Sequence, residues 1–205
     1  MKNFTLTLLV MLSFTLFQGC DKETERMEDF LAEFATVIKQ GDSYRFELDN
    51  GKILTPVDIK DYSGSDGERV IIYWTPIYGD SVKINHILPI FSGGVLIEGF
   101  PERYINDPLK ITSVWVEGEY LNLILEIEYH NTPHSFALFK DTSVTGTDLY
   151  LAHSNNNDQP GYPQAMYASF NLKTLRSQNG AAVPFRLFIN TNKGLQQFNF
   201  LIGAR

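Results

Sequence analysis

The feature that most constrains the fold is a succession of short alternating segments, separated by turn residues, from about residue 34 onward. The run 44–48 alternates polar and apolar side chains, and Asn50-Gly51 follows before an apolar pair at 53–54. Asn-Gly between such runs is typical of a tight hairpin, because both central turn positions need positive φ. Aromatic residues make up 13% of the chain, which suits half-buried sheet surfaces. The sequence therefore predicts an all-β protein.

The first half of this pattern has the size of a small barrel. Further strands are expected over 34–38, 69–75, 82–90 and 95–97. Pro76 is expected to end the third of the five strands, and alternation places Val82, Ile84 and His86 on one face of the fourth. About five strands in roughly 70 residues favour a barrel of the oligonucleotide/oligosaccharide-binding (OB) type.

The second half predicts a sandwich. The segment 100–108, bracketed by two prolines, breaks the pattern, so we place the boundary between a barrel at 34–107 and a second domain at 108–205. About seven strands with no helix beyond a short turn near 172–176 favour an antiparallel β-sandwich. Along its second strand we expect the polar residues Asn122, Glu126 and Glu128 to face outward. The strands are expected over 111–116, 120–129, 134–140, 147–153, 166–172, 183–190 and 195–202.

The N-terminal segment predicts export and lipidation. Residues 1–19 have signal-peptide anatomy, with Lys2 before an apolar stretch too short for a comfortable membrane span. The ending Gly19-Cys20 resembles a bacterial lipobox, which implies cleavage before Cys20 and transfer of diacylglycerol to its sulfur. Acyl chains such as palmitate gain about 0.8 kcal/mol per buried CH₂, so several chains make a lasting membrane anchor. Residues 20–33 are then a lipidated tether.

The residues after Cys20 bear on location. The acidic stretch 21–25 looks like the surface-export signal of lipoproteins from the anaerobic Gram-negative phylum common in gut and mouth. We therefore expect an envelope protein that is lipid-anchored to the outer membrane and exposed at the cell surface. Cys20 is the single cysteine of the sequence, so no disulfide within the chain is expected.

Four segments that follow the lipobox in order carry a family resemblance: 35–37, 46–51, 116–123 and 168–172. With them, nearly the whole mature chain resembles the NigD-like lipoproteins. The resemblance implies an N-terminal OB-type domain, a C-terminal β-sandwich and a role in bacteriocin production or immunity. It implies no catalytic residues.

Charge and motifs exclude several functions. The formal net charge is −7, and loss of Lys2 with the signal peptide makes it −8, which leaves no electrostatic footprint for nucleic acid. No nucleophile elbow, phosphate-binding loop or dinucleotide fingerprint occurs. Glu126 and Glu128 are expected to form a solvated face rather than a glycosidase pair. Cys20, consumed by lipid, is no nucleophile.

Histidines and the Asx-rich stretch suggest metal sites that the pattern does not favour. His130 and His134 are four residues apart, but a turn separates them and a third zinc ligand is not obvious, so both are expected to be exposed. His86 is expected to be a half-buried packing residue. The stretch 153–158, with Asp148 nearby, offers oxygen ligands for a calcium site, but an ordinary Asx-rich surface loop is the favoured prediction. No cofactor is expected.

Aromatic side chains are the remaining candidates for ligand contact. Tyr73, Trp74, Tyr78 and Trp115 could stack on a sugar or a peptide, although most are expected to fill the cores. The sequence thus favours a membrane-anchored, non-enzymatic binding protein with a protein or glycan partner. The alternatives are a carbohydrate-binding accessory lipoprotein and a surface hydrolase.

Overall fold

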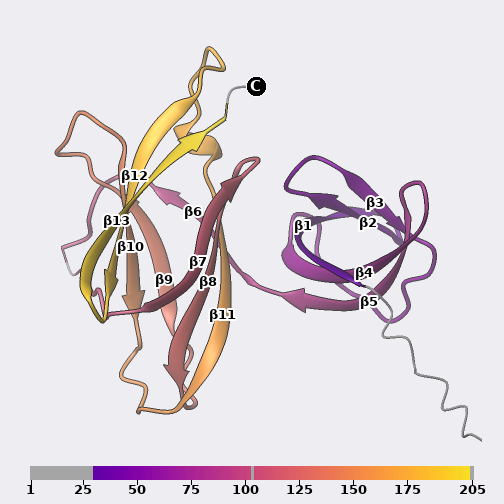
Figure 1. Ribbon diagram of the computed structural model, residues 1–205, viewed down its shortest axis with the longest axis horizontal. Coiled ribbons are helices and arrows are strands. Elements are labelled where there is room, and N and C mark those ends of the chain that lie inside the picture. The colour runs from indigo at the N-terminus through magenta and orange to yellow at the C-terminus, as the bar shows by residue number, and fades with distance from the viewer. Residues whose placement is uncertain (1–29, 103, 204–205) are drawn as a thin grey trace, which may run out of the picture.

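The computed structural model describes residues 30–102 and 104–203, and the expectations for residues 1–29, Cys20 included, lie outside this part. Figure 1 shows a small barrel beside a larger layered domain. In the described part, no helix is both long and apolar enough to cross a membrane. The strands are β1 (Leu31–Gln40), β2 (Ser43–Leu48), β3 (Ile53–Pro56), β4 (Arg69–Tyr78), β5 (Ser81–Pro89), β6 (Phe91–Leu96), β7 (Lys110–Glu117), β8 (Tyr120–Tyr129), β9 (Ser135–Lys140), β10 (Asp148–Ser154), β11 (Tyr162–Asn171), β12 (Val183–Thr191) and β13 (Gly194–Ile202).

Strands β1 to β5 form a closed barrel in the order β1-β2-β3-β5-β4. The predicted hairpin turn lies between β2 and β3, where Gly51 has a φ of 85°, a value that favours glycine. The barrel core contains the side chains on the inward positions of each strand. They are Ala35, Val37, Phe46, Leu48, Leu54, Val70, Ile72, Trp74 and Val82.

Three local expectations for the barrel are wrong. The tether was expected to extend to residue 33, but β1 begins at Leu31, because residues 31–33 pair with β4. The other two errors arise at β-bulges. Pro76 does not end β4, which continues to Tyr78, because the pairing with β5 shifts register between Pro76 and Tyr78 and proline is tolerated at such a bulge. A second shift follows Tyr73, which pairs with His86, whereas Trp74 pairs with Ile84. The extra residue turns His86 outward, so it is exposed rather than half-buried.

Strand β6 lies in the second domain, although the segment 95–97, which overlaps its end, was predicted to belong to the barrel. Its first half pairs with β11 and its second half, at Val95 and Leu96, pairs with β9. It thereby connects the layer β7-β8-β11 with the layer β9-β10-β12-β13. The barrel is already closed by five strands and offers β6 no free edge.

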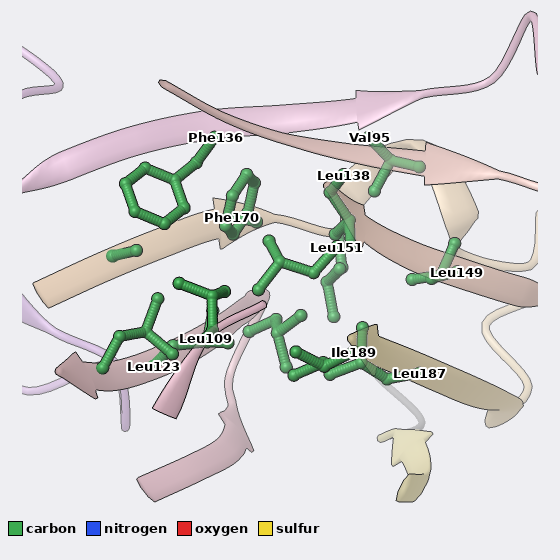
Figure 2. Close-up of a cluster of buried hydrophobic side chains, with 14 of the residues drawn as sticks. Val95, Leu109, Leu123, Phe136, Leu138, Leu149, Leu151, Phe170, Leu187 and Ile189 are labelled. Atoms are coloured by element: carbon green, nitrogen blue, oxygen red, sulfur yellow. The ribbon is translucent and has the colours of Figure 1, made fainter. Parts of the chain in front are cut away.

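The two layers enclose the larger core. Figure 2 shows side chains from both layers meeting there, with Val95, Leu138, Leu151 and Leu187 from one and Leu123 from the other. Three pairings among the described strands of the sandwich are parallel, β10 with β12 and β6 with both β9 and β11, so its sheet is mixed rather than purely antiparallel. The short turn expected near 172–176 is present as η2 (Lys173–Leu175).

Candidate functional site

Among the described residues, buried polar side chains gather at the junction between the barrel and the sandwich, and again within the sandwich. The cluster at the junction is described first. Arg69, the first residue of β4, is 2% exposed. Its guanidinium forms a two-point contact with the Asp49 carboxylate, with Nη1–Oδ1 at 2.7 Å and Nη2–Oδ2 at 3.0 Å. Such bidentate pairs are the strongest hydrogen-bonded charge pairs in proteins.

The sandwich completes this cluster. Arg69 Nε donates to Ser169 Oγ at 3.0 Å, and its guanidinium lies 3.7 Å from the centroid of the Tyr120 ring. Asn122 Nδ2 donates to Asp49 Oδ2 at 2.6 Å. Asn122 was expected to face solvent, but it is fully buried because the barrel covers this face of β8. We call these side chains the junction cluster, and their role is to fix the two domains against each other.

The second cluster joins two histidines that the sequence analysis considered separately. His134 precedes β9 and His153 lies on β10, where it pairs with Phe136. This register makes the two histidines diagonal neighbours on one face of the sheet. His134 Nδ1 and His153 Nε2 are 2.9 Å apart, and His153 Nδ1 lies 3.2 Å from the Asp107 carbonyl oxygen. His134 therefore contacts His153 and not His130, which is exposed as expected.

The contacts assign the protons of this pair. A carbonyl oxygen only accepts, so His153 Nδ1 carries a proton and donates to Asp107. Burial lowers the pKa of His153, and the hydrogen bond to Asp107 opposes that effect only in part. A neutral His153 then accepts at Nε2, and His134 Nδ1 is the donor.

Asp158 ends this chain of contacts. Its Oδ2 lies 3.6 Å from His134 Nε2, with side chains that are 1% and 3% exposed. The carboxylate accepts backbone N–H groups of His130 at 2.8 Å, Asn131 at 3.2 Å and Thr132 at 3.1 Å. Burial raises the pKa of Asp158, but these hydrogen bonds outweigh it and lower the pKa to about 2. His134 was expected to be exposed, and its side chain is buried because Asp158 holds the turn around it.

The Asx-rich loop is occupied by contacts within the protein. Asn156 and Asn157 have left-handed backbone conformations, with φ of 52° and 60°, which asparagine tolerates well. Asn156 Nδ2 donates to the Pro133 carbonyl at 2.7 Å and to Ser135 Oγ at 2.8 Å. In residues 30–102 and 104–203, no group of three His, Cys, Asp or Glu side chains is arranged to hold a metal ion. Asp148 is engaged elsewhere, by Arg186.

A hollow of about 320 Å³ opens beside the histidine pair. It lies at the end of β8 opposite the junction, because β8 begins at Tyr120 and carries Glu126 and Glu128 near its end. Lys110 is paired with Glu126 at 2.8 Å. The carboxylates of the lining exceed its one lysine, so the hollow favours a cationic group. We call it the acidic hollow, and its charged and histidine residues are Asp107, Lys110, Glu126, Glu128, His134, His153 and Asp158.

The four aromatic residues proposed for ligand contact lie in different surroundings. Trp74 is buried in the barrel and donates from Nε1 to Glu33 Oε2 at 2.9 Å. Trp115, on β7, packs edge-on against Phe34 at 5.1 Å and so helps join the domains. Tyr73 is half-buried, and Tyr78 is 87% exposed at the end of β4. None of the four lines the acidic hollow.

The NigD-like C-terminal beta sandwich domain matches residues 95–201, more than half of the chain. The chain belongs to the NigD-like family. The match begins within β6, in agreement with the pairing of that strand with the sandwich. No curated protein matches the chain.

Solved structures resemble this NigD-like chain over most of its length. A protein described as toxin-related, from Parabacteroides distasonis ATCC 8503, is 24% identical, with a TM-score of 0.77 over 85% of this chain and 94% of its own. A NigD-like immunity protein from Bacteroides caccae ATCC 43185 is 20% identical, with a TM-score of 0.67 over 83% and 91%. A protein described as a lipoprotein, from Bacteroides fragilis NCTC 9343, is 11% identical, with a TM-score of 0.62 over 86% and 98%. The prediction of a barrel followed by a sandwich is confirmed.

The junction cluster and the histidine pair were missed by the sequence analysis for different reasons. Arg69 and Asp49 are 20 residues apart, and nothing in their local pattern indicates that a second domain covers them. The histidine pair could have been predicted from the sequence. Once β9 and β10 are aligned as a hairpin, the diagonal relation of His134 and His153 follows.

Proposed function

We propose that this NigD-like protein is a lipid-anchored protein of the outer membrane that faces outward and binds a protein partner without catalysing a reaction. The observation that carries the binding part is the acidic hollow, with four carboxylates and a buried histidine pair in one lining. The lipobox-like ending at Cys20 supports the anchor. The likeness to a lipoprotein of Bacteroides fragilis is in keeping with it.

The partner that fits the acidic hollow is a protein segment with an exposed lysine or arginine. The shape is concave and about 320 Å³ in volume, enough for one long side chain rather than a large ligand. Arginine and lysine pair with carboxylates through charge-assisted hydrogen bonds. The Glu128 carboxylate is exposed at the end of β8, so it is accessible to such a side chain.

We place this binding in bacteriocin immunity or production. Support comes from the family and from the NigD-like immunity protein of Bacteroides caccae, which shares the fold. The mature chain has a calculated charge of −8, so it attracts basic proteins over a longer range as well.

The test is complementation of a strain that lacks the gene. We expect the deletion strain to become sensitive to bacteriocin-containing culture supernatants of related strains, and the wild-type gene to restore resistance. Glu126→Gln/Glu128→Gln should fail to restore it, because two charges of the acidic hollow are lost. The control Asp42→Asn/Glu47→Gln changes two exposed carboxylates of the barrel and should restore it. Unchanged sensitivity of the deletion strain, or full rescue by the hollow variant, would contradict the proposal.

One feature favours glycan binding as a second candidate. Tyr150 of β10 and Phe188 of β12 stack with centroids 4.7 Å apart on one face of the sheet. Aromatic faces of this kind bind sugars, although Phe100 packs edge-on against Tyr150 at 5.1 Å and covers part of it. A glycan array separates the two candidates, since binding that is lost in Phe188→Ala and kept in Glu126→Gln/Glu128→Gln would favour the glycan.

A further inference from the structure

The barrel has an apolar end at the point where the tether joins it. Phe30 and Leu31, at the start of β1, are 54% and 48% exposed. Ile77 and Tyr78, at the end of β4, are 55% and 87% exposed. Ile53, at the start of β3, is 38% exposed. We call these five residues the barrel tip.

Strand pairing brings the barrel tip together. Leu31 pairs with Trp74, and β4 continues four residues beyond that pair to Tyr78, past the start of β1. Tyr78 pairs with Ser81, which in turn pairs with Thr55, two residues after Ile53. The neighbouring strands β1 and β4, and β3, which is joined to β4 through β5, therefore expose apolar side chains at one end of the barrel. Contiguous exposed apolar surface of this kind marks an interaction site.

The position of the anchor indicates what covers the barrel tip. Nine residues lie between Cys20 and Phe30, and the ten steps from one Cα atom to the next span at most about 36 Å when the chain is fully extended. Lipid on Cys20 therefore keeps the barrel tip close to the bilayer. Tyr78 suits this setting, because tyrosine has an apolar ring and a polar end and is enriched at membrane interfaces.

We propose that the barrel tip rests on the membrane that holds the lipid of Cys20, an inference that depends on the proposed anchor. Contact with the bilayer buries the apolar side chains beside the anchor and fixes the orientation of the molecule. The charged residues near the barrel tip in the sequence, Lys52 and Lys83 against Asp29, Glu33 and Asp80, include no excess of basic residues, so apolar contact rather than attraction to anionic headgroups dominates.

The orientation has a consequence for the acidic hollow. Strand β4 runs from Arg69 in the junction cluster to Tyr78 in the barrel tip, a length of about 30 Å for ten residues. The sandwich is attached at the junction, so the barrel acts as a spacer between the bilayer and the sandwich. The acidic hollow, at the end of β8 away from the junction, is then presented to the solution.

The test is fluorescence quenching in vesicles. Lipidated protein carrying Tyr78→Cys is labelled with bimane at its one free thiol and reconstituted into phosphatidylcholine vesicles with brominated acyl chains. The control is Tyr162→Cys, 86% exposed at the start of β11 in the sandwich. We expect at least twofold stronger quenching at position 78 than at position 162. Ile77→Cys provides a second label site if Tyr78→Cys does not fold.

Two outcomes would overturn the inference, and they are distinguishable. Equal quenching at the barrel tip and at position 162, in protein whose lipidation is verified by mass spectrometry, refutes membrane contact and leaves the anchor intact. An unmodified sulfur at Cys20 in native protein refutes the anchor and the contact together.

Discussion

The junction cluster yields the sharpest prediction, because its ion pair can be compared with a second ion pair of similar length at the surface. Arg69–Asp49 and Lys110–Glu126 have nearly equal distances, 2.7 Å and 2.8 Å. The side chains are 3% exposed on both sides in the first pair, and 61% and 37% exposed in the second. The first pair is therefore buried and held by two hydrogen bonds, whereas the second is exposed and held by one, and both differences make the first pair contribute more to stability.

Asp49→Ala removes the carboxylate and leaves the buried guanidinium with neutral acceptors on Thr36, Ser169 and Asn122. Breaking a buried pair in this way costs about 3–5 kcal/mol. The matched control Lys110→Met breaks the exposed pair and should cost about 0–1 kcal/mol. The double variant Asp49→Leu/Arg69→Met removes both charges, so it should recover much of the loss.

The assay is urea unfolding followed by tryptophan fluorescence. Trp74 reports on the barrel, and Trp115 reports on the sandwich and on its contact with Phe34 of the barrel, so the variants Trp74→Phe and Trp115→Phe let the two signals be followed separately. We expect the wild type to unfold in one transition, and Asp49→Ala to lower the unfolding free energy and to give a separate transition for each domain. A loss no larger than that of Lys110→Met would show that the buried pair does not stabilise the junction, and our reasoning would be wrong.

Three further predictions concern the turn, the core and acid stability. Gly118→Ala should destabilise the protein more than Gly79→Ala. Both glycines have a φ of 58°, but only at Gly118 would a Cβ lie 2.3 Å from a backbone atom, the Asp49 carbonyl oxygen. Equal shifts of the thermal midpoint would contradict this. Leu187→Ala, in the sandwich core, should cost about 2–5 kcal/mol in urea unfolding, whereas Leu201→Ala at 56% exposure should cost less than about 1 kcal/mol, and similar costs would contradict the assigned core. The pKa of Asp158 falls from 3.8 to about 2 on folding, so its stabilisation is complete above pH 4 and is lost as the pH falls towards 2. The lowered pKa of His153 acts in the same direction at higher pH, from about 6.5 downward, because the folded state resists protonation there. The urea midpoint of Asp158→Asn should therefore fall less between pH 4 and pH 2 than that of the wild type, and parallel curves would contradict this.

Most strands could be predicted because their signals are local. Alternation with a period of two and glycine-containing turns are read within a few residues, as at Asn50-Gly51 and at 117–119. The errors arise where a single extra residue changes the outcome. At the bulge after Tyr73, one residue moves His86 from the inner to the outer face, and the period alone does not show where such a residue lies.

The candidate site was harder to predict because it depends on contacts between segments far apart in the chain. Asn122 reads as an outward polar residue on an alternating strand, and only the presence of the barrel makes it buried. Asp107 contributes through its backbone carbonyl, which no side-chain pattern reveals. Asp158 is the exception, since an acidic residue in an Asx-rich loop was recognised, although its partners are backbone groups rather than a cation.

The crossing of β6 between the layers affects any attempt to isolate the sandwich. A fragment that starts at Pro108, where the sequence predicts the domain boundary, lacks the strand that pairs with β9 and β11. Such a fragment would expose two unpaired sheet edges and leave the place of Val95 in the core empty. A shorter protein with this fold must therefore begin before Phe91, and exchange of domains between relatives should respect the same limit.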